Sequence, residues 1–102
     1  MARSEQHQEL IDKIVNEYYD LVGTTDDGSR KFHVIRARNC ISVALRGYYG
    51  TKEIGKAIGR SHANVVTHKK THESNLQFMP GYKAHFKKAQ QVVSKYLQDH
   101  EL

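Results

Sequence analysis

Apolar residues recur at intervals of three and four along most of this 102-residue chain, and no segment alternates as a strand does. In residues 4–22 this spacing runs from Leu10 to Val22, with Ser4 placed as an N-cap and Gly23 as a C′ glycine. The same pattern predicts helices over about 34–49, 51–58, 61–72 and 82–97, with Asn75, Pro80 and Gly81 in the last connection. The sequence therefore predicts an all-α fold.

The length fits one domain, in which a chain of this size buries roughly 60–68% of its unfolded surface. Charged residues make up 26% of the chain and aromatic residues 9%, a composition that folds. We therefore expect a single helical domain over 1–102. Its parts are a first amphipathic helix (4–22), a basic loop with two further helical segments (30–72) and a C-terminal helix (82–97).

Charge is segregated along the chain. Residues 1–29 carry a net charge of −5, residues 30–70 carry +9 and residues 71–102 carry +1. In the middle segment ten Lys and Arg residues stand against Glu53 alone. The commonest intracellular polyanion is nucleic acid, so this concentration of positive charge favours nucleic-acid binding over a merely solvated surface.

Several classes of protein are disfavoured by what the sequence lacks. No apolar run is long enough for a membrane span, and MARSEQHQEL has no signal-peptide core. A single cysteine, Cys40, allows no intramolecular disulfide and suits a reducing cytoplasm. We expect a cytoplasmic protein, of the bacterial nucleoid or of a phage-infected bacterial cell, that does not associate with membranes.

The segment from Thr51 to His68, TKEIGKAIGRSHANVVTH, contains the most specific pattern. We expect Thr51 to cap a short helix that Gly59 ends, and Ser61 to cap a second helix. This is the arrangement of a helix-turn-helix, in which the second helix enters the major groove. Arg60 to Asn64 supply short polar or basic side chains at its N-terminus, where Arg can bond guanine and Asn adenine.

Four motifs in order resemble the C-terminal DNA-binding domain (domain IV) of the bacterial replication initiator DnaA. IDKIVNEYY (11–19) resembles its opening helix, and RKFHVIRARN (30–39) its basic loop and the Pro-Arg-Gln start of the next helix. EIGKAIG (53–59) is similar to the family's E-I-G-x-A-F-G, and RSHANVV (60–66) lies over its R-D-H-T-T-V signature. The resemblance covers about residues 10–72 and implies a Trp repressor-like, all-α fold with a helix-turn-helix core.

The resemblance also implies site residues. Arg30, with Lys31, would reach the minor groove, Arg38 and Arg46 would lie against phosphates, and 60–64 would face the major groove. Ser61, Ala63 and Asn64 stand where the family has Asp and two Thr, so the target sequence stays open. The residues expected at DNA are Arg30, Lys31, Arg36, Arg38, Arg46, Lys52, Arg60, Ser61, His62, Ala63, Asn64, Thr67 and His68.

The chain has no phosphate-binding loop and no room for an ATPase domain. We therefore expect a stand-alone double-stranded DNA-binding protein, a replication or transcription regulator in contact with that machinery. Two alternatives stay open. One is a sigma-factor-like or other helix-turn-helix transcription factor, and the other is a phage or structural protein that uses its basic face on a protein partner.

Other chemistry finds little support in the sequence. His68 and His72 are four residues apart, but no third ligand accompanies them, so we expect no metal and interpret them as histidines near phosphates. Cys40 lies on an apolar helix face, and no residue pair has catalytic spacing. We expect neither enzymatic activity, cofactor nor small-molecule substrate. In each of the pairs 18–19 and 48–49 we expect at least one tyrosine to belong to the core.

Overall fold

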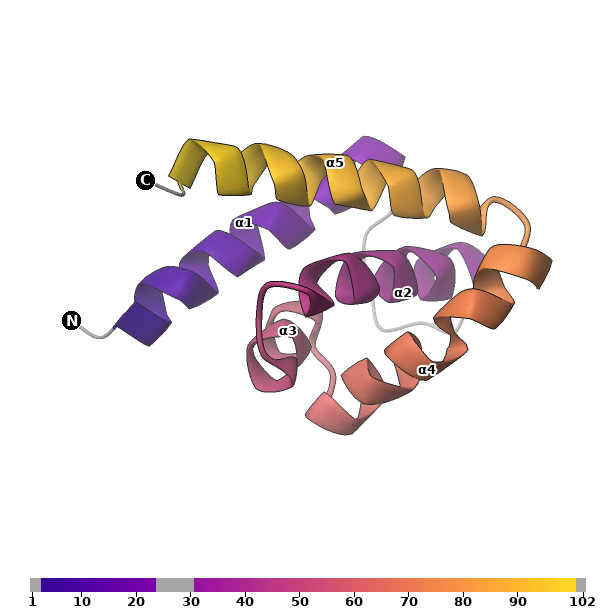
Figure 1. The fold of residues 1–102 in the computed structure, drawn as a ribbon, viewed down its shortest axis with the longest axis horizontal. Helices are drawn as coiled ribbons and strands as arrows, with labels where there is room; N and C mark the ends of the chain where they lie inside the picture. Colours follow the sequence, from indigo (N-terminus) through magenta and orange to yellow (C-terminus); the bar gives the residue numbers. More distant parts are fainter. Residues whose placement is uncertain (1–2, 24–30, 101–102) are drawn as a thin grey trace.

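The computed structural model describes residues 3–23 and 31–100, and within them the side chains of 8–23 and 31–97. This part of the chain forms helices only, so the prediction of an all-α fold is confirmed. The helices are α1 (Arg3–Val22), α2 (Phe32–Arg46), α3 (Thr51–Ile58), α4 (His62–Phe78) and α5 (Tyr82–His100). In Figure 1, α2 crosses the middle, α1 and α5 cover one side of it, and α3 and α4 lie on the other.

The central helix α2 contacts all four other helices. Ten of its 15 residues are buried, including the unbroken run from Ala37 to Leu45. A helix that is surrounded on all sides has little solvent face, so even its polar residues become enclosed. This enclosure buries three polar residues that stand among apolar neighbours in the sequence, Arg38, Asn39 and Ser42.

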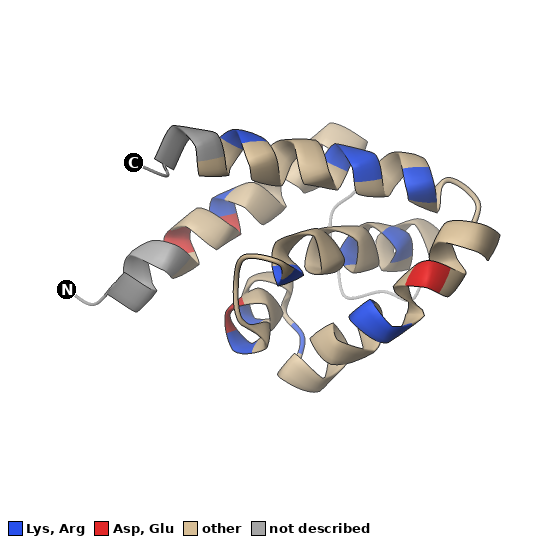
Figure 2. Ribbon diagram, viewed as in Figure 1, with Lys and Arg blue, Asp and Glu red and all other residues tan. Residues whose placement is uncertain are grey.

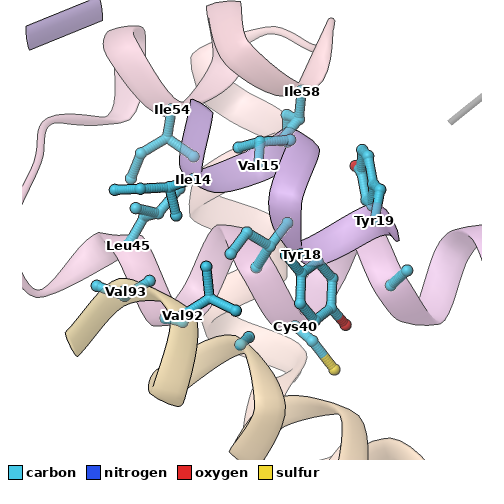
Figure 3. Packing of buried hydrophobic residues seen from close by; sticks show 14 of the residues in the cluster. Ile14, Val15, Tyr18, Tyr19, Cys40, Leu45, Ile54, Ile58, Val92 and Val93 are labelled. Carbon is cyan, nitrogen blue, oxygen red and sulfur yellow. The ribbon is translucent and has the colours of Figure 1, made fainter. Parts of the chain in front are cut away.

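The hydrophobic core joins side chains from every helix. In Figure 3, Ile14 and Val15 of α1 point toward Ile54 and Ile58 of α3, and Tyr18 points toward Cys40 of α2. Each fully buried aliphatic side chain of this kind contributes about 1.5–3 kcal/mol by leaving water. The remaining core members are Ile11, Tyr19, Ala37, Ile41, Ala44, Leu45, Val65, Tyr82, Ala89, Val92 and Val93.

Cys40 is a fully buried core residue, as predicted. Burial raises the pKa of its thiol to about 12, so the group is a thiol at neutral pH. The tyrosine pairs also pack as predicted, because Tyr18 and Tyr19 are buried and Tyr49 packs against the core. Tyr48, by contrast, is 61% exposed.

Several helix limits differ from those expected. α2 ends at Arg46 and not near Tyr49, because the N–H groups of Tyr48 and Tyr49 both bond to the carbonyl of Leu45, each at 3.0 Å, and turn the chain. Gly50, not Thr51, is the N-cap of α3. α1 begins at Arg3, so Ser4 lies inside its first turn.

The helix α4 extends to Phe78, six residues beyond the expected end at His72, and Asn75 lies inside it. No helix-breaking residue occurs before Pro80, and a proline disfavours helical geometry in the residue that precedes it. Met79 accordingly has φ −89° and ψ 116° and ends the helix. The C-terminal helix α5 likewise continues past the expected end at residue 97, to His100.

The acidic first helix packs behind the unit formed by α3 and α4. Among the described residues α1 contacts α2, α3 and α5 but not α4. The Glu17 carboxylate accepts hydrogen bonds from Lys95 Nζ at 3.1 Å and Tyr96 OH at 3.0 Å, and these bonds hold the pKa of Glu17 below its usual range. This contact joins α1 to α5.

Candidate nucleic-acid interface

The turn between α3 and α4 is defined by two backbone hydrogen bonds. The Gly59 N–H bonds to the Lys56 carbonyl at 3.4 Å and the Arg60 N–H to the Gly55 carbonyl at 2.8 Å, which is the Schellman pattern. Gly59 has φ +70°, a conformation that glycine adopts without steric cost. The sequence correctly predicted that Gly59 ends α3, and Ser61 is the N-cap of α4, as expected.

The first turn of α4 presents a row of polar and small side chains. Ser61, His62, Ala63 and Asn64 are all exposed, while Val65 anchors this turn in the core. Ser61 Oγ accepts a hydrogen bond from the Asn64 N–H at 3.4 Å. The other N–H groups of a helix start have no partner within the helix, and they add partial positive charge for an anion. This turn therefore offers hydrogen-bond donors and partial positive charge at the surface of the protein.

A hollow of about 540 Å³ opens between α2 and the N-terminal half of α4. We call it the α2–α4 hollow. It is lined by residues of α2, the α3–α4 turn and α4, namely Ile35, Arg38, Asn39, Arg60, Asn64, Thr67, His68 and Thr71. The structure thus brings together five residues that the sequence predicted at DNA, Arg38, Arg60, Asn64, Thr67 and His68.

Arg38 gives the hollow a charge that is largely removed from water. Arg38 is only 7% exposed, and the adjacent Asn39 is equally buried. A guanidinium is the side-chain cation best suited to such a position, because it is weakly hydrated and forks toward two oxygen atoms. The geometry therefore places a largely buried guanidinium in the wall of the hollow.

His68 lines the same hollow as Arg38 and Arg60. Burial, and then the fields of Arg38 and Arg60, lower the pKa of its imidazole to about 4. The ring is thus neutral at pH 7. Its Nδ1 atom is buried and finds no hydrogen-bond partner among the described residues.

Arg36 lies elsewhere, although the sequence placed it at DNA. Its Nη1 donates to the Pro80 carbonyl at 3.1 Å, its Nη2 lies 3.4 Å from His85 Nε2, and its guanidinium stacks over the Phe32 ring at 5.2 Å. Residues 36 and 38 point to different sides of α2, as residues two apart on a helix must. These contacts place Arg36 against the α4–α5 turn and outside the α2–α4 hollow.

The remaining predicted cations are spread over the surface. Lys31 is exposed at the N-cap of α2, Lys52 is exposed in the first turn of α3, and Arg46 is half-buried in the last turn of α2. Arg30 lies outside the described residues. Figure 2 shows basic positions on α2, on the α3–α4 turn, on α4 and on α5, whereas acidic positions lie on α1 and also on α3 and α4.

Two residues of the hollow were missing from the predicted site. Asn39 and Thr71 both line it, and Thr71 Oγ1 donates to the Thr67 carbonyl at 3.2 Å. The four-residue spacing from Thr67 to Thr71 could have indicated a shared helix face. Asn39 had no such signal, because only the docking of α4 shows which side of α2 faces the hollow.

His72, which the sequence predicted near phosphates, is half-buried and packs against α5. Its Nδ1 lies 2.8 Å from Tyr82 OH and its ring lies 4.4 Å from that of Phe86. Among the described residues no group of three His, Cys, Asp or Glu could hold a metal ion. No helix in this part of the chain has the length and apolar character to cross a membrane.

Comparisons of the chain with protein-family models, with curated proteins and with solved structures found no match. The structure defines the class, a small protein built of α-helices. The similarity to the DnaA DNA-binding domain stays a prediction that rests on the four sequence motifs.

Proposed function

We propose that this protein binds double-stranded DNA, with the first turn of α4 in the major groove and the α2–α4 hollow against the sugar-phosphate backbone. The observation that carries the proposal is the hollow itself, where Arg38, Arg60 and His68 converge beside the exposed turn 61–64. Base edges are read by short polar side chains at a helix N-terminus, and phosphates are bound by cations at its flank.

Each part of this surface has a distinct task. His62 and Asn64 are exposed and short enough to reach base edges, where an Asn amide pairs with adenine. Arg38 and Arg60, which line the same hollow, bind the phosphate backbone beside the groove. Lys31 and Arg30 would extend the contact to the neighbouring minor groove, as the resemblance implies.

The proposed biological role is that of a replication or transcription regulator that resembles the DnaA DNA-binding domain and has no ATPase activity of its own. Neutralising about five phosphates would give a slope of log K against log salt near −4 to −5. Such a slope means that most of the affinity is electrostatic, whereas the choice of sequence lies with residues 61–64.

The first experiment is selection from a randomised duplex pool at physiological salt, followed by sequencing of the retained DNA. Enrichment of one motif is expected. Retention without enrichment would make the protein a non-specific binder, and no retention would contradict the proposal.

A matched pair of variants locates the surface. Arg60→Ala removes one charge from the hollow, and Lys88→Ala removes one from the exposed side of α5. We expect the first to weaken DNA binding about tenfold, or roughly 1–2 kcal/mol for one charge-assisted contact, and the second to change it little. Equal losses of affinity in the two variants would mean that DNA binds elsewhere or that binding depends on net charge alone.

A second candidate function is supported by the opposite end of α4. An open hollow of about 510 Å³ there is lined by Leu76, Met79, Gly81, Lys83, Ala84 and Lys87, and Phe78 beside it in the sequence is 78% exposed. Apolar residues flanked by lysines fit an acidic protein surface, such as one on the replication or transcription machinery. Binding of purified RNA polymerase that Met79→Glu abolishes and Arg60→Ala leaves intact would support this function.

A further inference from the structure

The end of α4 and the start of α5 carry an exposed apolar surface. The open hollow of about 510 Å³ at this place is lined by Leu76, Met79, Gly81, Lys83, Ala84 and Lys87, and we call it the α4–α5 hollow. Phe78, the last residue of α4, is 78% exposed, the largest exposed fraction among the large hydrophobic residues that the structure describes. Exposed apolar surface of this kind marks a place of contact with another molecule.

The rim of the α4–α5 hollow is positively charged. Lys83 and Lys87 are four residues apart on α5, so they lie on one face of that helix. The sequence from residue 74 to residue 98 contains four lysines and no carboxylate. Among the described residues neither Lys83 nor Lys87 forms an ion pair. An acidic surface is therefore the complementary partner of this hollow.

A symmetrical contact between two such hollows is disfavoured by charge. In an isologous dimer the same surface of each copy faces the other, so the lysines of the two copies would meet. Like charges that are brought together at an interface cost free energy. A second copy of the chain can therefore cover the hollow only with a different, acidic surface of its own.

The helix α1 offers such a surface. The described side chains of residues 8–23 include four carboxylates and one lysine, a net charge of −3. Glu9, Asp12 and Asp20 are exposed at positions that share one side of the helix. Leu21 follows directly and is 52% exposed, and it is the exposed large hydrophobic residue described in this acidic helix. An apolar side chain with acidic neighbours matches an apolar hollow with a basic rim.

We propose that α1 of a second copy of this protein docks on the α4–α5 hollow, with the partner's Leu21 in the hollow and the partner's Asp20 beside Lys83 and Lys87. The contact is heterologous, because it joins two different surfaces of the chain. Each pair therefore keeps one free α1 and one free hollow, and further copies can add head to tail. The inference is independent of DNA binding, and it assigns a partner to the hollow that the second candidate function uses.

The apolar and the charged contacts have different tasks in this interface. Exposed ion pairs add little free energy, because water screens both charges. The apolar side chain that leaves water on docking therefore supplies most of the affinity. The charges decide which surface meets which, and they make the association weaken as the salt concentration rises.

The proposed contact leaves the candidate nucleic-acid interface open. The α4–α5 hollow lies at the end of α4 and the turn 61–64 at its start, and a helix of 17 residues separates the two by about 25 Å. Copies that associate in this way would bind adjacent sites on one duplex cooperatively.

The test is a complementation experiment by analytical ultracentrifugation of the purified chain without DNA. Ala84→Glu places a carboxylate in the hollow, and Leu21→Lys places a lysine on the docking side of α1; both positions are exposed, so the fold should be kept. We expect the wild type to associate as its concentration rises, and each variant alone to associate at least about tenfold more weakly. An equimolar mixture of the two variants should form a heterodimer, because the intact α1 of one meets the intact hollow of the other.

The matched controls are Gln91→Glu and Tyr48→Lys, which make the same changes of charge at exposed positions outside both surfaces and should associate as the wild type does. A wild type that stays monomeric at every concentration would overturn the inference and leave the hollow to another acidic protein. A Leu21→Lys protein that associates normally, or a mixture that stays monomeric, would overturn the head-to-tail contact. Ala84→Glu should bind a duplex with one site as tightly as the wild type, so this test and the test of DNA binding fail separately.

Discussion

The helices α2 and α4 have similar lengths but opposite relations to solvent. Ten of the 15 residues of α2 are buried, whereas Val65 is the only buried one among the 17 residues of α4. α2 is surrounded by four helices, while α4 contacts α2, α3 and α5 and leaves its outer face open. The comparison separates a helix that holds the fold together from a helix that leaves most of its surface exposed to solvent.

The largest effect should come from a cavity in α2. Ile41 is fully buried at the centre of the core, so Ile41→Ala should lower the free energy of unfolding by about 2–5 kcal/mol. Thr67→Ala, on the exposed face of α4, should change it by less than about 0.5 kcal/mol. Urea unfolding followed by circular dichroism measures both. Similar losses for the two variants would remove the distinction between the helices.

The second prediction concerns a substitution that disturbs the junction of α3 and α4, which orients α4. A Cβ atom on Gly55 would lie 2.5 Å from the Arg60 carbonyl oxygen, and backbone atoms cannot move aside cheaply. Gly55→Ala should therefore cost about 1–3 kcal/mol of stability and displace residues 61–64, with loss of DNA binding.

Gly47→Ala is the matched control, because a Cβ there meets nothing within 4 Å and φ is −74°. This variant should be neutral or slightly stabilising in the same unfolding and binding assays. A Gly55→Ala protein that folds and binds like the wild type would show that α3 and α4 do not need this close approach.

The third prediction sharpens the contrast between α2 and α4, because substitutions on α4 should change DNA binding without changing the fold. Asn64→Ala or His62→Ala should each weaken binding to the selected duplex by about 1–3 kcal/mol and affect random DNA little. Both residues are exposed, so the free energy of unfolding should stay within about 0.5 kcal/mol of the wild type. Fluorescence anisotropy on the two duplexes measures this, with the exposed Gln91→Ala of α5 as the control. Equal losses on both duplexes would contradict the reading of bases by α4.

The smallest effect concerns stability in acid. The pKa of His68 is lowered to about 4 in the folded protein. Between about pH 6.5 and pH 4 the unfolded chain therefore binds a proton at this residue that the native state does not bind. The contribution of the neutral ring is complete above pH 6.5 and is lost as the pH falls toward 4. The urea midpoint should therefore fall more between pH 7 and pH 4.5 in the wild type than in His68→Gln. The control variant is His33→Gln, at an exposed position of α2. A parallel drop in all three proteins would contradict the effect.

Much of the local structure could be predicted because it depends on neighbours in the chain. Helical spacing, the C′ glycine at residue 59 and the N-cap at Ser61 are properties of a few consecutive residues, and all are present. Helix ends were predicted less well where a backbone turn, as at Tyr48 and Tyr49, or the distance to Pro80 sets the limit.

The sequence named residues of the candidate site but did not predict their arrangement. Charge segregation pointed to the basic middle segment, and five of the predicted residues do line one hollow. Helical spacing puts Arg36 and Arg38 on different sides of one helix, but the sequence does not say which side faces the hollow. Only the positions of α4 and α5 direct the first to Pro80 and the second to the hollow.

The sequence by itself determined that this protein is helical and that a turn separates α3 from α4. It also determined that the positive charge is concentrated between residues 30 and 70. The tertiary structure decided that α2 is enclosed, that Arg38 is buried beside His68, and that α4 keeps an open face. The reason is the range of the forces involved. Spacing and caps act within one or two turns of a helix, whereas burial and the electric field at a side chain depend on residues far apart in the chain.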